Sequence, residues 1–137
     1  MKMKTKGIFT SANPYLYFNG DCIKAITLYE KAFNVKAEVM PNREAENLVE
    51  HAKFKIGNDA IFLCDAQYPV KTGDNMMIAT KFDATSESTT AAAKAAFDIL
   101  KEDGQVIMKL EETSWNKCFG ILIDKFGVKW NMCGGLK

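Results

Sequence analysis

Residues 15–33, YLYFNGDCIKAITLYEKAF, decide the fold of this chain. Tyr15 to Phe18 is a short aromatic run, which is typical of a β-strand. Asp21 is a suitable N-cap residue, and Asn34 suits the end of a helix. Between them lies an apolar stripe with helical spacing, made of Ile23, Ile26, Leu28, Tyr29, Ala32 and Phe33. The stretch therefore predicts a strand followed at once by a helix from about Asp21 to Phe33.

Three further strands are expected after this helix. Lys36 to Met40 is the first candidate. From Glu50 to Ile56 the residues alternate, with Ala52, Phe54 and Ile56 on one face and His51, Lys53 and Lys55 on the other. Gly57-Asn58-Asp59 is a turn and Ala60 to Cys64 returns, so these two segments predict a hairpin.

The same order of elements repeats in the second half. A strand is expected from Met76 to Phe82, then a helix from Ser86 to Glu102, with Thr85 or Ser86 as its cap and Gly104 at its end. The last three strands are expected at Gln105 to Glu111, Cys118 to Ile123 and Val128 to Met132. The fold class is therefore α+β, in one domain spanning residues 1–137. It consists of two βαβββ modules, at about 10–67 and 75–134, joined near Tyr68 to Asn75. Each module is expected to bury its sheet against its own helix and to leave a concave face for a ligand.

Composition excludes several classes of protein. The 137 residues carry a formal net charge of +1, which favours neither a nucleic acid nor a membrane surface as partner. No apolar run has the length of a signal peptide or a membrane span, so a cytoplasmic location is the default. The cysteines are scattered and are expected to be small buried apolar side chains: Cys22, Cys64, Cys118 and Cys133. Cys22 is the exception, because it lies in the predicted first turn of a helix, where the pKa of a thiol can fall.

Three local motifs, in order along the chain, resemble those of a known protein family. Tyr15 to Cys22 with Ala25-Ile26 and Tyr29 forms the first, and His51 to Asn58 with Leu63 and Asp65 forms the second. The third consists of Trp115, Cys118-Phe119-Gly120, Asp124, Phe126-Gly127-Val128 and Trp130. Together they resemble the vicinal-oxygen-chelate superfamily of glyoxalase I, bleomycin-resistance proteins and extradiol dioxygenases, and most of all its PhnB-like branch. The resemblance implies a glyoxalase-like curved mixed sheet around a cleft, and a homodimer.

Enzymes of this superfamily typically hold a divalent metal with His or Glu from four inner strands. Aligned on this chain, those positions fall near Asn13 or Pro14, within Leu63 to Asp65, within Met76 to Ile78, and on Asn131. Asp65 alone could ligate well, and His51 is the single histidine of the chain. One carboxylate and an amide do not make a transition-metal site, so we expect neither a metal nor another cofactor.

His51 admits two interpretations. It is either an acid/base or ligand-binding group on the concave face, or a polar strand residue satisfied by a neighbour or by solvent. No catalytic residue is assigned, and His51 is the only candidate. The residues expected to line a ligand cleft are Tyr15, Tyr17, His51, Lys53, Met77, Trp115, Cys118 and Asn131.

Three functions are compatible with these features. The first is a metal-free protein that binds a small molecule. The second is a glyoxalase- or dioxygenase-type enzyme that uses a metal or His51. The third is an interaction protein with a filled cleft. The chain lacks a GxGxxG loop, which argues against nucleotide binding, and no glycine-rich cofactor loop supports the methyltransferase label that some relatives carry.

Overall fold

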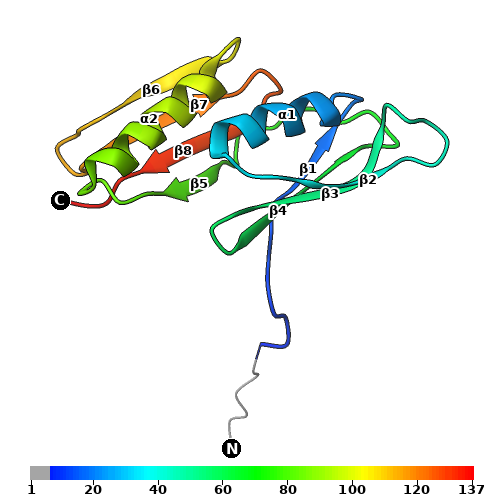
Figure 1. Cartoon of the computed structure of the whole chain (residues 1–137), viewed down its shortest axis with the longest axis horizontal. Helices are drawn as coiled ribbons and strands as arrows, with labels where there is room; N and C mark the ends of the chain where they lie inside the picture. The colour runs from blue at the N-terminus through cyan, green and yellow to red at the C-terminus, as the bar shows by residue number, and fades with distance from the viewer. Residues whose placement is uncertain (1–6) are drawn as a thin grey trace, which may run out of the picture.

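Each half of the chain folds in the order that the sequence predicts. The computed structural model describes residues 7–137 (Figure 1). The first module contains β1 (Tyr15–Phe18), α1 (Cys22–Phe33), β2 (Glu38–Pro41), β3 (Val49–Ile56) and β4 (Asp59–Asp65). The second contains β5 (Ile78–Lys81), α2 (Glu87–Lys101), β6 (Gln105–Glu111), β7 (Phe119–Ile123) and β8 (Lys129–Cys133). The α+β fold of two βαβββ modules is confirmed.

The two sheets share one topology. Their strand orders are β1-β4-β3-β2 and β5-β8-β7-β6, with one parallel pair in each, β1 with β4 and β5 with β8. Phe18 lies opposite Asp65 in the first sheet, and Lys81 lies opposite Cys133 in the second. Asp65 and Cys133 therefore occupy equivalent positions in the two modules.

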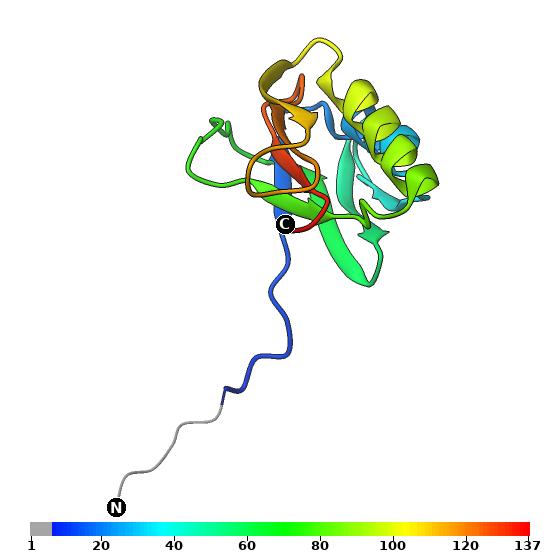
Figure 2. The same cartoon turned by 90° about the vertical axis from the view of Figure 1, so that its left-hand side faces the viewer.

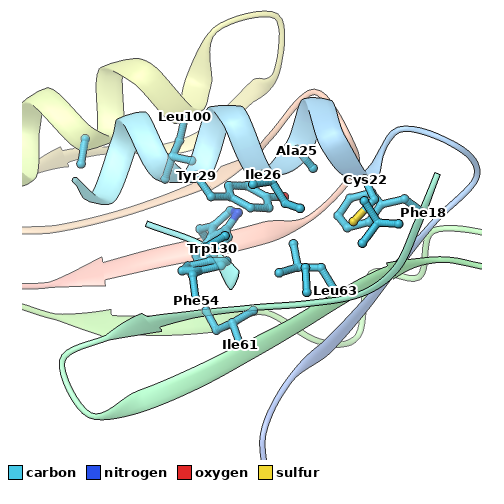
Figure 3. Packing of buried hydrophobic residues seen from close by; sticks show 14 of the residues in the cluster. Phe18, Cys22, Ala25, Ile26, Tyr29, Phe54, Ile61, Leu63, Leu100 and Trp130 are labelled. Atoms are coloured by element: carbon cyan, nitrogen blue, oxygen red, sulfur yellow. The ribbon is translucent and has the colours of Figure 1, made fainter. Parts of the chain in front are cut away.

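The core joins the two modules instead of dividing between them. Helices α1 and α2 contact each other and lie end to end along the molecule in Figure 1. The ring of Trp130 on β8 lies 5.3 Å from that of Tyr29 on α1 (Figure 3). It also lies 5.1 Å from the ring of Phe33 on the same helix. The ring of Phe54 on β3 lies 5.8 Å from that of Tyr29. Each helix contacts strands of its own sheet, as expected, and α1 in addition carries large rings that reach β8 of the second sheet.

A buried carboxylate fixes this junction. Asp124 accepts hydrogen bonds from Tyr29 Oη at 2.7 Å and from Trp130 Nε1 at 2.9 Å. The backbone N–H groups of Phe126 and Val128 donate to its other oxygen. Burial and the neighbouring Asp124 charge together raise the pKa of Tyr29 well above its usual value. Four donors thus compensate the burial of this carboxylate and join α1 to the β7–β8 turn.

The start of α1 differs from expectation. Asp21 precedes the helix but makes no side-chain cap hydrogen bond, and its ψ of 10° is not extended as in a typical N-cap residue. Asp65 at the end of β4 takes this role instead, since its Oδ1 accepts from Gly20 N at 2.9 Å and Cys22 N at 3.1 Å. Within α1, Ile23 is 43% exposed, whereas Cys22 and Ala25 are fully buried and replace it on the inner face.

The second module follows the prediction more closely. Ser86 caps α2, because its Oγ accepts from Thr89 N at 3.2 Å. The strand expected from Met76 to Phe82 is shorter, Ile78–Lys81, and the residues before it belong to the connecting segment. Residues 7–14 run away from the body of the protein towards the N-terminus (Figures 1 and 2). In residues 7–137 neither helix has the length and apolarity needed to cross a membrane.

Candidate functional site

Aromatic side chains gather on the face of the first sheet that points away from the core. On β1, Leu16 and Phe18 pack inward, while Tyr15 and Tyr17 are 41% and 45% exposed. Five ring contacts connect the set: Tyr15 to Tyr17 at 5.0 Å, Tyr15 to His51 at 5.7 Å, Tyr15 to Phe62 at 5.7 Å, His51 to Phe62 at 5.5 Å, and Tyr17 to Tyr68 at 6.4 Å. We call Tyr15, Tyr17, His51, Phe62 and Tyr68 the aromatic face. Such a surface offers apolar area together with polar groups at the ring edges.

Tyr15 and His51 form the polar contact of this face. Tyr15 Oη lies 2.8 Å from His51 Nδ1, a hydrogen bond between β1 and β3 that passes across β4. Burial raises the pKa of Tyr15, and proximity to the thiol of Cys64 adds to this effect. The phenol therefore keeps its proton at neutral pH. The alternation predicted for β3 is confirmed, because Ala52 and Phe54 are buried and His51 lies on the other side.

Lys53 follows His51 on the same face of β3. Its ammonium group lies 3.2 Å from Glu38 Oε2 on the neighbouring strand β2, and the Glu38 side chain is largely exposed. An exposed ion pair of this kind contributes little to stability. Lys53, which lies opposite Phe62 on β4, is therefore held by a weak partner.

A groove of about 790 Å³ begins at β1, the strand that carries Tyr15 and Tyr17. Its walls come from residues 12–19, from 70–78 in the connecting segment, and from 125–129 in the β7–β8 turn. Tyr15, Tyr17 and Met77 all line it. Two reciprocal hydrogen bonds between Asn19 and the backbone of Val70, both 2.9 Å, fix the connecting segment beside it. The groove thus lies next to the aromatic face and shares two of its tyrosines.

The remaining predicted ligand residues lie on the second module and form separate contacts. Asn131 Nδ2 donates to Met77 Sδ at 3.3 Å, and Asn131 Oδ1 is buried without a hydrogen-bond partner in residues 7–137. The ring of Trp115 lies 4.6 Å from that of Phe119. Cys118 is only 4% exposed, and burial raises its pKa. The structure therefore brings Tyr15, Tyr17 and His51 together, with Met77 on the shared groove.

Sequence reasoning missed two members of the aromatic face. Phe62 lies in β4 between the inward-facing Ile61 and Leu63, so the alternation of that strand could have indicated it. Tyr68 lies in the connecting segment, where no periodic pattern was available. Tyr68 reaches the aromatic face because the connecting segment runs beside the end of β1, where its ring contacts that of Tyr17.

The positions at which this fold usually holds a metal do not fit one here. Asn13 donates to the carbonyl of Ala60, and Leu63 is buried in the core. Asp65, the one good ligand, already accepts three backbone N–H groups, those of Gly20, Cys22 and Val49. In the described part of the chain, no three His, Cys, Asp or Glu side chains form a group that could hold a metal ion. The side chains at these positions offer thioethers, amides and one fully engaged carboxylate, which are a poor donor set for a transition metal.

Cys22 is not the reactive thiol that its place in the first helical turn suggested. Its pKa is raised to about 12, first by burial and then by the nearby Asp65 charge. The effect of the helix N-terminus is therefore outweighed, because the side chain is fully buried and faces a carboxylate. The thiol remains protonated at neutral pH.

The chain is similar in sequence and in fold to several known proteins. The model of the Glyoxalase/Bleomycin resistance protein/Dioxygenase superfamily matches residues 11–132. Protein YjdN of Escherichia coli is 28% identical over 140 residues, which cover 86% of this chain and 90% of that protein. The structure of PA1353 from Pseudomonas aeruginosa is similar with a TM-score of 0.75 and 27% identity, covering 91% of this chain and 97% of that one. The PhnB protein of Bacillus cereus shares the fold with a TM-score of 0.73 and 22% identity, covering 90% and 98% of the two chains.

Proposed function

The chain belongs to the Glyoxalase/Bleomycin resistance protein/Dioxygenase superfamily, and on that premise we propose that it is a metal-independent protein that binds a small organic molecule. The aromatic face carries this proposal. Exposed and half-buried rings in mutual contact, with a hydroxyl and an imidazole among them, are the usual lining of a site for an apolar ligand.

The adjoining groove supports the same proposal. Its volume of about 790 Å³ lies within the range of roughly 300–1,000 Å³ that is usual for small-molecule sites. Its lining combines the apolar Met76, Met77 and Phe126 with the tyrosines of β1. An amphipathic ligand could therefore contact the rings of the first module and the connecting segment at the same time.

Metal independence follows from the chemistry of the donors. The carboxylate of Asp65 serves as a cap for α1 and for the start of β3, and withdrawing it to bind a cation would leave three backbone N–H groups unpaired. Asn131 is an amide at the position where a carboxylate is expected. Ligand binding therefore depends on the aromatic face and not on a chelated cation.

We include a homodimer in the proposal. The outer strands of the two sheets, β2 and β6, carry exposed apolar side chains: Val39, Met40, Val106, Ile107 and Met108. Exposed edge strands of this kind are normally covered by another chain or element. Sedimentation equilibrium should give twice the mass of 15.3 kDa, and a monomer at micromolar concentration would contradict this part of the proposal.

A thermal-shift screen of aromatic compounds, run with and without EDTA, tests the function. A ligand at about 100 times its Kd stabilises the fold by about 2.7 kcal/mol, and the shift should be the same with EDTA. Tyr17→Ala should reduce the shift, whereas Phe9→Ala, which removes an exposed ring outside the groove, should not. Stabilisation that EDTA abolishes and one equivalent of a divalent metal restores would refute metal independence.

The Tyr15–His51 hydrogen bond favours one second candidate, a metal-free enzyme in which His51 transfers a proton. Each compound that binds can be followed by NMR over hours in the presence of the protein. Chemical conversion that disappears in His51→Ala would favour the enzyme, whereas unchanged compounds favour a binding protein.

A further inference from the structure

We propose that the ligand of the aromatic face carries an oxyanion group, bound by the Nε2–H of His51 and the ammonium group of Lys53, with its apolar part against Tyr15 and Phe62. This inference rests on the proposed binding function and adds the chemical class of the ligand.

The hydrogen bond between Tyr15 and His51 indicates which nitrogen of His51 can donate to a ligand. A protonated phenol is a stronger donor than acceptor and a neutral imidazole nitrogen is a good acceptor, which favours donation from Tyr15 Oη to Nδ1 across the 2.8 Å between them. A neutral imidazole that accepts at Nδ1 carries its proton on Nε2. In the described part of the chain no group forms a hydrogen bond with Nε2. His51 therefore presents a free donor to a ligand.

Lys53 adds a positive charge beside this donor. Residues two apart on a strand project from the same face, about 7 Å apart along the strand. Across the sheet, Lys53 lies directly opposite Phe62 on β4 and Glu38 on β2. An oxyanion can displace the exposed Glu38 carboxylate, since surface ion pairs are weak and a ligand bound against the rings is partly removed from water.

The rings define the rest of the ligand. Phe62 lies between Tyr15 and His51, with centroids 5.7 and 5.5 Å away. Tyrosines alone would also suit a cation, which binds over the face of a ring. The donor on His51 and the charge on Lys53 instead favour an anion, so the ligand class is an aromatic or otherwise apolar anion.

The tautomer can be measured directly because His51 is the only histidine of the chain. In ¹⁵N-labelled protein above the pH at which the imidazole titrates, we expect Nε2 to be protonated and Nδ1 to be unprotonated. Tyr15→Phe keeps the ring but removes the donor, so it should give a mixture of the two tautomers. A predominant Nδ1–H tautomer in the wild-type protein would overturn the inference.

The ligand class can be tested with three probes of one shape: benzoate, benzamide and benzylamine. NMR titration should show that benzoate perturbs His51 and binds at least about tenfold more tightly than benzylamine, as expected for a charge-assisted hydrogen bond. Lys53→Met, which keeps much of the aliphatic stem, should weaken benzoate several-fold and leave benzamide unchanged. Lys55→Met, a matched change further along β3, should affect neither probe.

The outcomes separate the two proposals. Preference for benzylamine would overturn the oxyanion inference and leave the binding function intact. Equal affinity for benzoate and benzamide would overturn it too, because the charge of the ligand would then contribute nothing. If none of the probes perturbs the aromatic face at millimolar concentration, the proposed binding function is itself contradicted at this site.

Discussion

Helices α1 and α2 begin at corresponding places in the two modules, yet different residues cap them. In the second module the cap is local, because Ser86 immediately precedes α2 and accepts from Thr89 N. In the first module the cap is remote, since Asp65 lies at the end of β4, 43 residues beyond Cys22. The equivalent position in the second module is Cys133, which has no carboxylate to offer.

The length of the turn before each helix explains the difference. After β1 the chain enters α1 through Asn19, Gly20 and Asp21, and Asp21 is not extended. The longer turn from Phe82 to Ser86 allows an extended N-cap residue with ψ of 120°. A short turn thus transfers the cap to another strand, and this couples the helix to its sheet. Variants at each helix start measure that coupling.

The largest effect is expected for Asp65→Ala. Three backbone N–H groups lose a charged acceptor, so the free energy of unfolding should fall by about 2–4 kcal/mol. Asp65→Asn keeps an acceptor oxygen and should lose about half as much. Urea denaturation followed by circular dichroism measures both. A loss below about 0.5 kcal/mol for Asp65→Ala would mean that the remote cap does not stabilise α1.

The next effect concerns the thiol beside that cap. The pKa of Cys22 is raised from 9.0 to about 12, so the unfolded chain releases this proton at lower pH than the folded one. Its stabilising contribution is complete below pH 9 and is lost as the pH rises towards 12, by at most about 1.4 kcal/mol per pH unit. Denaturation between pH 8 and 11 should therefore show a shallower decline for Cys22→Ala than for wild type. Cys133→Ala, which retains Cys22, is the control, and equal slopes in all three proteins would contradict the prediction.

A smaller effect is expected at the local cap. Ser86→Ala removes one neutral acceptor from the start of α2, so unfolding should become easier by about 1 kcal/mol. The same urea measurement applies. If this variant lost as much stability as Asp65→Ala, the distinction between the local and the remote cap would disappear.

The smallest effect is expected for Asp21→Ala. Its side chain makes no cap hydrogen bond, so the change in the free energy of unfolding should stay within about 0.5 kcal/mol. A loss of 1 kcal/mol or more would show that Asp21 caps α1 in solution. This variant is also the matched control for Asp65→Ala at the same turn.

These helix starts show what the sequence could predict. Ser86 was one of the two predicted caps, with Thr85, because its partner lies three residues away, within reach of a local pattern. Asp65 was singled out as a possible metal ligand, and its capping role depends on the pairing of β1 with β4, which no local pattern contains. On the candidate site, strand alternation placed His51 on the face opposite Ala52 and Phe54, and Tyr15 and Tyr17 were expected in the same ligand cleft. The hydrogen bond between Tyr15 and His51 was not predictable, because it crosses a third strand.

The junction at Asp124 has a consequence for how the whole chain melts. Its carboxylate accepts hydrogen bonds from Tyr29 of the first module and Trp130 of the second, so separating the modules would break the Tyr29 bond and expose the rings packed around it to water. Heating should therefore give a single calorimetric transition, with equal calorimetric and van't Hoff enthalpies. Proteolytic nicking within residues 71–77, which are exposed, should yield two fragments that still elute together.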